Sequence, residues 1–355
     1  MKFNYNKRGD FLNKYLSSVL FIVVFTTFSS GCHRINSNNQ LNTKNIEVID
    51  SVSNFEVIEI KDYPSASGIV CVDSTIFIVG DDARDLLVLN VERLKIKFPG
   101  NQKTNNKGRV EKKYKLDFEA LNYIMEDSVI WGWGSGSKYP SRYFQFGYDI
   151  SSKKLRFTSL QQTYKKLQKD AGLKPQKWNI EGALNFANHF ALVNRETNSL
   201  LFYSLSDWKK YFKDSSHSIE VPKLKFKLEL DSLMPSIQGI KSTLSGGEYS
   251  SSAGGLFLSA SVEDDKGIIN DGDILGSFIC FIPVKSSSIN STTPNLDINH
   301  MRFLKIASSR LNKNLKLEGV GINTQNEIYG VVDNDDGTSL LIKFKSSEIE
   351  TMINN

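Results

Sequence analysis

Apolar runs and polar tips recur in a fixed order five times along this chain. In the best-formed copy, Glu181-Gly182 opens an apolar run that ends at Phe186, and a short polar turn leads into a second apolar run from His189. That second run ends at the polar tip Asn194-Arg195-Glu196. Two apolar runs joined by a short polar turn predict a β-hairpin in each copy. The copies begin at Ser67, Glu119, Glu181, Gln238 and Glu318, and repeats at such spacing indicate a solenoid, an array or a propeller.

Further strands complete the repeat. A third apolar run follows each hairpin, and a fourth precedes the next copy, but the last copy has no fourth run before the chain ends. Phe55–Ile60, ahead of the first copy, is a strand pattern without a copy of its own. We therefore predict an all-β fold, a β-propeller of five blades over residues 55–345 whose ring is closed by this N-terminal strand. Six blades and a two-sheet sandwich are the alternatives.

Three segments depart from the strand pattern. Residues 159–172 carry apolar side chains at helical spacing and predict a surface helix. Residues 206–212 predict a short helix, and residues 286–293 predict a polar loop. We expect all three to be insertions on the outside of the ring.

The N-terminus has the composition of a targeting segment. Basic residues precede an apolar run, Leu16 to Phe28, that is too short to span a bilayer. The residues Ser29-Ser30-Gly31-Cys32 resemble the lipobox of bacterial lipoproteins, in which the cysteine is acylated, for example with palmitate. This resemblance implies a signal peptide over residues 1–31 and a lipidated Cys32 at the start of a tether, residues 32–54. An ordinary secretory signal is the alternative. Residues 346–355 are assigned to a C-terminal tail.

Charge and cysteine content exclude several classes of protein. The formal net charge is +5, but basic residues of the leader supply most of it, so no basic field remains that would favour nucleic acid. Cys71 and Cys280 both lie in apolar strand patterns, which favours two buried thiols over a disulfide. The sequence contains no cysteine and histidine cluster with zinc spacing.

The propeller geometry predicts a functional face. In a blade, the first strand begins and the second strand ends on the same face of the ring, which we call the mouth. The predicted binding residues at the mouth are Glu119, Glu181, Arg195, Glu196, Gln238 and Glu318. Acidic residues that follow second strands are candidate ligands of a calcium ion, namely Asp81, Asp82, Asp264, Asp333 and Asp335. In the alternative interpretation Glu-Gly is scaffold: the glycine allows close packing and the glutamate accepts backbone hydrogen bonds from the next blade.

These residues carry a resemblance to a known family. The order of Glu-Gly, strand, turn, strand and Asn/Asp-x-Glu is similar to the esterase-like phytase and SdiA-regulated group of bacterial β-propellers. Residues 179–196 match best, and residues 317–335 come next. The resemblance implies a calcium site and a phosphate site built from lysine and arginine. For the phosphate site the mouth offers Arg195, with Arg84 and Lys241 as further candidates.

Two functions follow as predictions. The first is a binding propeller in the bacterial cell envelope, lipid-anchored to a membrane and facing the periplasm or the exterior. Its acidic mouth would bind a small molecule, a glycan or a protein. The alternative is a calcium-assisted phosphoesterase or esterase of the phytase-like type. We favour the binding function, because no complete set of catalytic residues can be assembled from the sequence.

Overall fold

The computed structural model describes most of the chain beyond the tether. The described residues are 47–52, 55–90, 92–100, 102–213, 219–264, 272–285, 293–307, 313–334 and 336–354. Cys32 and the predicted signal peptide lie outside them, as do Asp335 and residues 286–292 of the predicted polar loop. Among the described residues, no helix is long and apolar enough to cross a bilayer.

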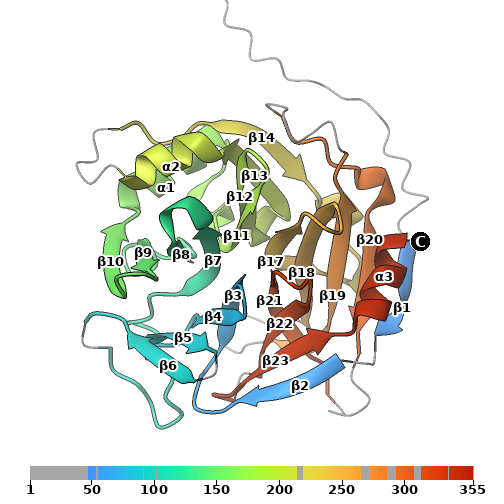
Figure 1. Cartoon of the computed structure of the whole chain (residues 1–355), viewed down its shortest axis with the longest axis horizontal. Coiled ribbons are helices and arrows are strands. Elements are labelled where there is room, and N and C mark those ends of the chain that lie inside the picture. Colours follow the sequence, from blue (N-terminus) through green and yellow to red (C-terminus); the bar gives the residue numbers. More distant parts are fainter. Residues whose placement is uncertain are drawn as a thin grey trace, which may run out of the picture. The chain divides into compact units, whose positions relative to one another are not determined.

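Five four-stranded antiparallel units form a ring (Figure 1). Blade one contains β3 (Ala66–Val72), β4 (Thr75–Gly80), β5 (Asp85–Leu89) and β6 (Arg93–Lys97). Blade two contains β7 (Phe118–Ile124), β8 (Val129–Gly134), β9 (Phe144–Asp149) and β10 (Lys154–Ser159). Blade three contains β11 (Ile180–Phe186), β12 (His189–Asn194), β13 (Ser199–Ser204) and β14 (Leu224–Glu229). In these three blades the strands follow one another in chain order from the centre outwards, as the sequence predicts.

The last two blades also use the N-terminal strands. Blade four contains β17 (Thr243–Ser250), β18 (Gly255–Asp264), β19 (Asp273–Pro283) and β20 (Arg302–Ile306). Blade five contains β21 (Lys316–Ile322), β22 (Ile328–Asp333), β23 (Ser339–Phe344) and, as its outer strand, β2 (Phe55–Ile60). Antiparallel pairing of β2 with β23 runs from Phe55 opposite Phe344 to Ile60 opposite Ser339. The prediction of a five-bladed propeller closed by the N-terminal strand is confirmed.

One strand lies in the segment that the sequence analysis assigns to the tether. Residues Glu47–Val52 form β1, which pairs in parallel with β20 and adds a fifth strand to blade four. Since β1 joins blade four and β2 joins blade five, the N-terminal segment links the outer edges of two neighbouring blades. This arrangement pairs an outer edge of blade four that would otherwise present free backbone groups.

Three helices cover the outer parts of the ring. The predicted insertions are confirmed as α1 (Gln161–Asp170) and α2 (Leu205–Lys213). Both helices bury side chains in the apolar cluster between blades two and three, notably Tyr164, Leu167, Trp208 and Phe212. A third helix, α3 (Ser346–Asn354), replaces the predicted C-terminal tail. Its Ile349 and Met352 are buried, because the helix packs its apolar side against the core of blades four and five.

Both described cysteines are free thiols, as the sequence predicts. Cys280 is fully buried in β19, whereas Cys71 is partly exposed at the end of β3. Burial raises the pKa of each thiol above its usual value. We infer that both are poor nucleophiles and belong to the packing of their blades.

Candidate functional site

The five inner strands begin at the mouth with the same irregularity. In each blade the pairing register of the inner strand shifts at one residue. These five residues are Ser67, Glu119, Glu181, Ser245 and Glu318. A β-bulge of this kind inserts an unpaired residue and redirects its side chain, and it is common at the rims of barrels and beside functional sites. The repeated sequence motif is therefore a repeated bulge.

The residue after each bulge explains why glycine is so frequent there. A Cβ atom on Gly246 would lie 2.8 Å from the carbonyl oxygen of Glu318, and one on Gly319 would lie 2.6 Å from that of Ser67. Both distances are too short for a side chain to be tolerated without movement of the backbone. Glycine thus allows inner strands of neighbouring blades to approach closely, as the scaffold interpretation predicts.

The scaffold interpretation also predicts that the side chain at the bulge forms a hydrogen bond with the backbone of the next blade. Among the described residues serine forms such a bond, and glutamate does not. Ser67 donates a hydrogen bond to the carbonyl oxygen of Phe118 at 2.8 Å, and Ser245 donates to that of Leu317 at 2.7 Å. These bonds link one blade to the next. Glu181 instead accepts a hydrogen bond from the side chain of Asn179 at 2.6 Å, and Glu318 pairs with Lys316. The glutamates are therefore available for an electrostatic role at the mouth.

The assignment of Gln238 to the mouth requires a correction. Gln238 and Gly239 have φ values of 52° and 80° and form the turn between β15 (Ser236–Ile237) and β16 (Ile240–Lys241). Two successive positive φ values are typical of a type I′ hairpin turn. Gln-Gly resembles the Glu-Gly of the other copies, but the equivalent bulge of blade four lies at Ser245-Gly246.

One half of the mouth is a cluster of acids around Lys115, which we call the Lys115 cluster. The ammonium group of Lys115 pairs with Asp81, lies 3.4 Å from Asp82 and lies 3.1 Å from Asp117. Arg109 approaches Asp82 to 2.6 Å. Arg142 lies 3.0 Å from Asp117, which also accepts a hydrogen bond from Ser135. The predicted candidates Asp81 and Asp82 thus lie in the mouth, but each is paired with a base.

The other half is built around Arg195, and we call it the Arg195 cluster. Arg195 donates a hydrogen bond to Glu263 and lies 3.9 Å from Glu318. Lys316 lies 2.9 Å from Glu318 and 3.5 Å from Glu263. Burial acts to raise the pKa of Glu263, but Arg195 and Lys316 outweigh it and lower that pKa to about 2. Glu263 is therefore a permanent anion between two cations.

Glu119 and Glu181 differ from the other acids in their electrostatics. Burial, reinforced by the charges of Glu181, Asp117 and Asp81, raises the pKa of Glu119 well above its usual value. Burial also raises the pKa of Glu181 to about 8, although Arg195 acts in the opposite direction. Both groups therefore bind a proton more tightly than an ordinary glutamate does, and a cation that displaces those protons would find two carboxylates.

The remaining predicted residues lie outside the two clusters. Glu196 is exposed and lies 3.8 Å from Lys177. Asp264 ends β18 opposite Asp273. Lys241, a candidate for the phosphate site, lies 2.7 Å from Asp231. Asp333 ends β22 and is buried, and its charge helps hold the pKa of Arg109 above the usual value against the effect of burial.

Sequence reasoning missed most of the bases that neutralise the mouth. These are Arg109, Lys115, Arg142 and Lys316. A signal for two of them is present, because Lys115, Asp117 and Glu119 alternate along the approach to β7, and Lys316 and Glu318 alternate in β21. Residues two apart in an extended chain share a face, so this spacing alone would place each lysine beside the same acids. Before β7 the structure departs from that extended geometry, because Asp117 has a φ of 59°. Arg109 and Arg142 lie in long loops and give no such signal.

A candidate cation site lies within the Lys115 cluster. One carboxylate oxygen from each of Asp81, Asp117 and Glu119 lies within 4.8 Å of the other two. Calcium prefers oxygen ligands of this kind. The donor set suits a hard cation, and the ammonium group of Lys115 already pairs with two of its three members. Of the predicted calcium ligands that the structure describes, only Asp81 belongs to this group.

Comparison with solved structures gives several proteins at low similarity, among them two propeller-like enzymes. Glutaminyl cyclase from Myxococcus xanthus shares 13% identity at a TM-score of 0.41, over 84% of this chain and 98% of that one. A streptogramin B lyase shares 9% identity at a TM-score of 0.36, over 81% and 97% of the two chains. A protein of unknown function from Bacteroides thetaiotaomicron shares 8% identity at a TM-score of 0.40, over 82% and 72%. At these values the likenesses carry no argument about activity.

Comparison with curated proteins gave no match. Comparison with family models matched a family of unknown function over residues 62–345, which include both clusters of the mouth and every blade strand except β1 and β2. Because the match extends over most of the chain, the protein belongs to this family, DUF6929.

Proposed function

We propose that the protein is a binding propeller of the bacterial cell envelope, held on a membrane by an acylated Cys32, whose mouth binds a cationic ligand. Glu119 is the observation that carries the binding proposal. Glu119 is only 8% exposed, yet its carboxyl group accepts no hydrogen bond from any residue that the structure describes. Burial and three neighbouring acids disfavour the ionised form of Glu119, with only Lys115 acting against them, and a bound cation would offset that cost.

The balance of charge at the mouth supports a cation rather than an anion. The two clusters together contain seven carboxyl groups, from Asp81, Asp82, Asp117, Glu119, Glu181, Glu263 and Glu318. They contain five basic groups, from Arg109, Lys115, Arg142, Arg195 and Lys316. The carboxyl groups outnumber the bases by two, so a net negative charge arises when Glu119 and Glu181, whose pKa values are raised, both lose their protons to a bound cation. This negative charge is concentrated at Glu119 and Glu181. The nearby bases, Lys115 for Glu119 and Arg195 for Glu181, only partly offset the effects that raise the two pKa values.

The shape of the ring limits how such a ligand approaches. Inner strands surround a central space of only about 10 Å³, lined by Glu119, Glu181 and the inner glycines. A space of that volume holds about one water molecule. We infer that the ligand engages from the mouth face, through a metal ion or through an ammonium or guanidinium group.

Replacing Glu119 tests this proposal. We expect calcium or methylammonium to bind the wild-type protein in isothermal titration, and Glu119→Gln to bind roughly tenfold more weakly, since one charged partner is lost. Because the cation displaces protons held by Glu119 and Glu181, binding should strengthen with rising pH and release protons. Repeating the titration in buffers of different ionisation enthalpy measures that release.

Glu196→Gln is the matched control, because Glu196 is exposed and lies outside both clusters. It should bind like the wild type. If neither cation binds the wild type, or if the two variants bind alike, the mouth is scaffold and the proposal fails.

A second candidate function is calcium-assisted hydrolysis of phosphate esters. It is favoured by the oxygens of Asp81, Asp117 and Glu119 within 4.8 Å of one another, beside the basic groups Arg109 and Arg142. When bound there, calcium would polarise a phosphoryl oxygen, and the arginines would hold the anionic ester. Turnover of a phosphomonoester that requires calcium and is lost in Asp81→Asn would support this function. Cation binding without turnover would leave the binding function alone.

The membrane anchor is tested separately from the mouth. The sequence Ser30-Gly31-Cys32 motivates this part of the proposal, and Cys32 lies outside the described residues. Metabolic labelling with a fatty acid should mark the wild type and leave Cys32→Ser unlabelled, since a diacyl anchor gives stable attachment. Equal labelling of the two proteins would exclude acylation at Cys32, whatever the result at the mouth.

A further inference from the structure

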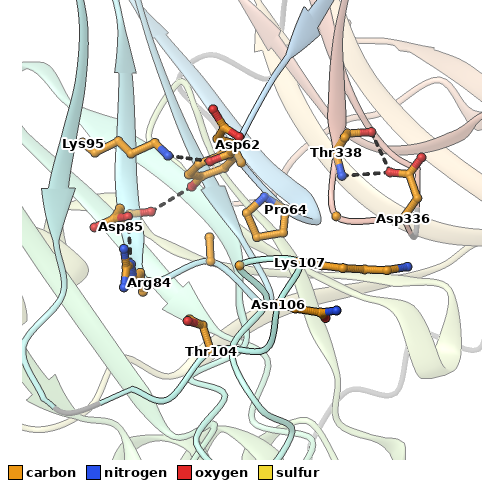
Figure 2. Close-up of a pocket in the computed structure, with 14 residues that line it drawn as sticks. Asp62, Pro64, Arg84, Asp85, Lys95, Thr104, Asn106, Lys107, Asp336 and Thr338 are labelled. Atoms are coloured by element: carbon orange, nitrogen blue, oxygen red, sulfur yellow. Dashed lines mark hydrogen bonds and ion pairs between the residues drawn. The ribbon is translucent and has the colours of Figure 1, made fainter.

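A pocket of about 420 Å³ opens beside the mouth, between blades one and five (Figure 2). It is formed by the loops that follow β2, β4, β6 and β22, with Lys95 contributed by β6. The loop after β6 and the loop after β22 are packed against each other, because a Cβ atom on Gly337 would lie 3.1 Å from the carbonyl oxygen of Lys107. The volume of the pocket lies in the range that is usual for small-molecule binding sites.

The pocket shares two loops with the Lys115 cluster. The loop after β4 places Asp82 in that cluster and Arg84 in the pocket. The loop after β6 places Lys107 in the pocket and Arg109 in the ion pair with Asp82. The pocket therefore lies on the functional face of the ring, although none of its lining residues belongs to the two clusters.

The side chains that line the pocket have no net charge, and several of the charged groups have hydrogen-bond or ion-pair partners within the pocket. Acidic and basic residues are equal in number: Asp62, Asp85 and Asp336 against Arg84, Lys95 and Lys107. Arg84 lies 3.7 Å from Asp85, and Lys95 donates to the carbonyl oxygen of Asp62. Asp336 accepts hydrogen bonds from the backbone nitrogen and the hydroxyl group of Thr338 at 2.8 and 2.6 Å. A ligand with a net charge would disturb this balance, and a neutral one would not.

Several polar groups remain available to such a ligand. The side chains of Thr104, Asn106 and Lys107 make no hydrogen bond to any residue described in the structure, and all three line the pocket; in Figure 2 Asn106 and Lys107 extend to the side of Asp336, and Thr104 lies on the side of Arg84. The guanidinium group of Arg84 is half-exposed. Together they offer hydrogen-bond donors and acceptors at short intervals, above a floor that includes Pro64 and Ala83.

We propose that this pocket binds a neutral polyhydroxylated molecule of the size of a mono- or disaccharide. A hydroxyl group both donates and accepts, so one ligand of this class can donate to Asn106 and Asp336 and accept from Arg84 and Lys107. Hydrogen bonds to charged groups supply more affinity than those between neutral groups. The site differs from the cation site in residues, ligand and charge.

The test uses saturation-transfer NMR on the full chain with glucose and maltose as probes, and with glucuronate and glucosamine as charged comparisons. We expect transfer to the neutral sugars, and none to the charged ones at equal concentration. Asn106→Trp should abolish the transfer by filling the pocket, and Lys107→Met should weaken binding roughly tenfold through the loss of one charged donor.

Lys112→Met is the matched control, because Lys112 is exposed on the same loop outside the pocket. It should bind like the wild type. Thermal unfolding checks that each variant is folded. Absence of transfer from both neutral sugars, equal transfer in folded Asn106→Trp, or preference for a charged sugar would each overturn the proposal.

Discussion

Deletion of residues 32–62 is expected to give a chain that aggregates or unfolds without a cooperative transition. The deletion removes β1 and β2, so β23 loses its six-residue pairing with β2 and exposes its backbone groups. It also removes the buried side chains of Phe55 and Ile60, each worth about 1.5–3 kcal/mol of burial. Urea unfolding followed by circular dichroism, together with size-exclusion chromatography, measures both effects.

Deletion of residues 33–45 is the control, since it leaves both strands intact and should not change stability. A soluble 32–62 deletion that unfolds in one cooperative transition would show that the ring does not need β2. The comparison also distinguishes loss of the strands from loss of the preceding tether.

Arg195→Met is expected to destabilise the fold strongly at pH 8. The substitution keeps a long side chain but removes the positive charge beside Glu181, Glu263 and Glu318. Loss of one partner from a buried ion pair costs about 3–5 kcal/mol, because the remaining charge stays buried without compensation. The free energy of unfolding, measured by urea titration, checks this value.

The destabilisation caused by Arg195→Met should become smaller as the pH falls. The direction of this pH dependence follows from the pKa of Glu181. Its pKa in the folded protein is raised to about 8, so the folded state binds this proton more tightly than the unfolded state. Its contribution to stability is therefore full below the unfolded pKa of about 4.3 and is lost as the pH rises through about 8. Protonation of Glu181 at lower pH removes one of the charges that Arg195 neutralises.

Two controls keep this prediction specific. Lys177→Met removes a base whose ion pair among the described residues is with the exposed Glu196, and it should change the free energy of unfolding by less than about 1 kcal/mol. Glu181→Gln should flatten the decline of stability between about pH 4.3 and 8. Equal stability of Arg195→Met and the wild type at pH 8 would mean that the charge of Arg195 makes no net contribution to the stability of the fold.

The arrangement of the mouth has a consequence for how the family could vary. Ser67 and Ser245 bind the backbone of the next blade, whereas the three glutamates at the equivalent bulges face charged partners. The same backbone position therefore serves either to join blades or to place charge. Exchange between serine and glutamate at a bulge would change the electrostatics of the mouth without changing the ring.

The sequence by itself determined the ring. Alternating apolar runs, the recurrence of Glu-Gly, and an N-terminal strand pattern without a copy of its own were enough to predict five blades and their closure. This is possible because strand patterning and repeat spacing are local properties that survive in a single sequence. The helices α1 and α2 were predictable for the same reason.

Only the tertiary structure decided what the mouth contains. Lys115 and Lys316 enter it because strands reaching the ring centre bring their preceding residues together, and Arg109 and Arg142 arrive on loops far apart in the chain. Gln238 lies outside the mouth, because Gln238 and Gly239 have positive φ values and form a turn, and the bulge of blade four lies at Ser245. Charge pairing depends on distances between blades, which no local pattern encodes, so a mouth that reads as acidic in sequence is largely neutralised in the fold.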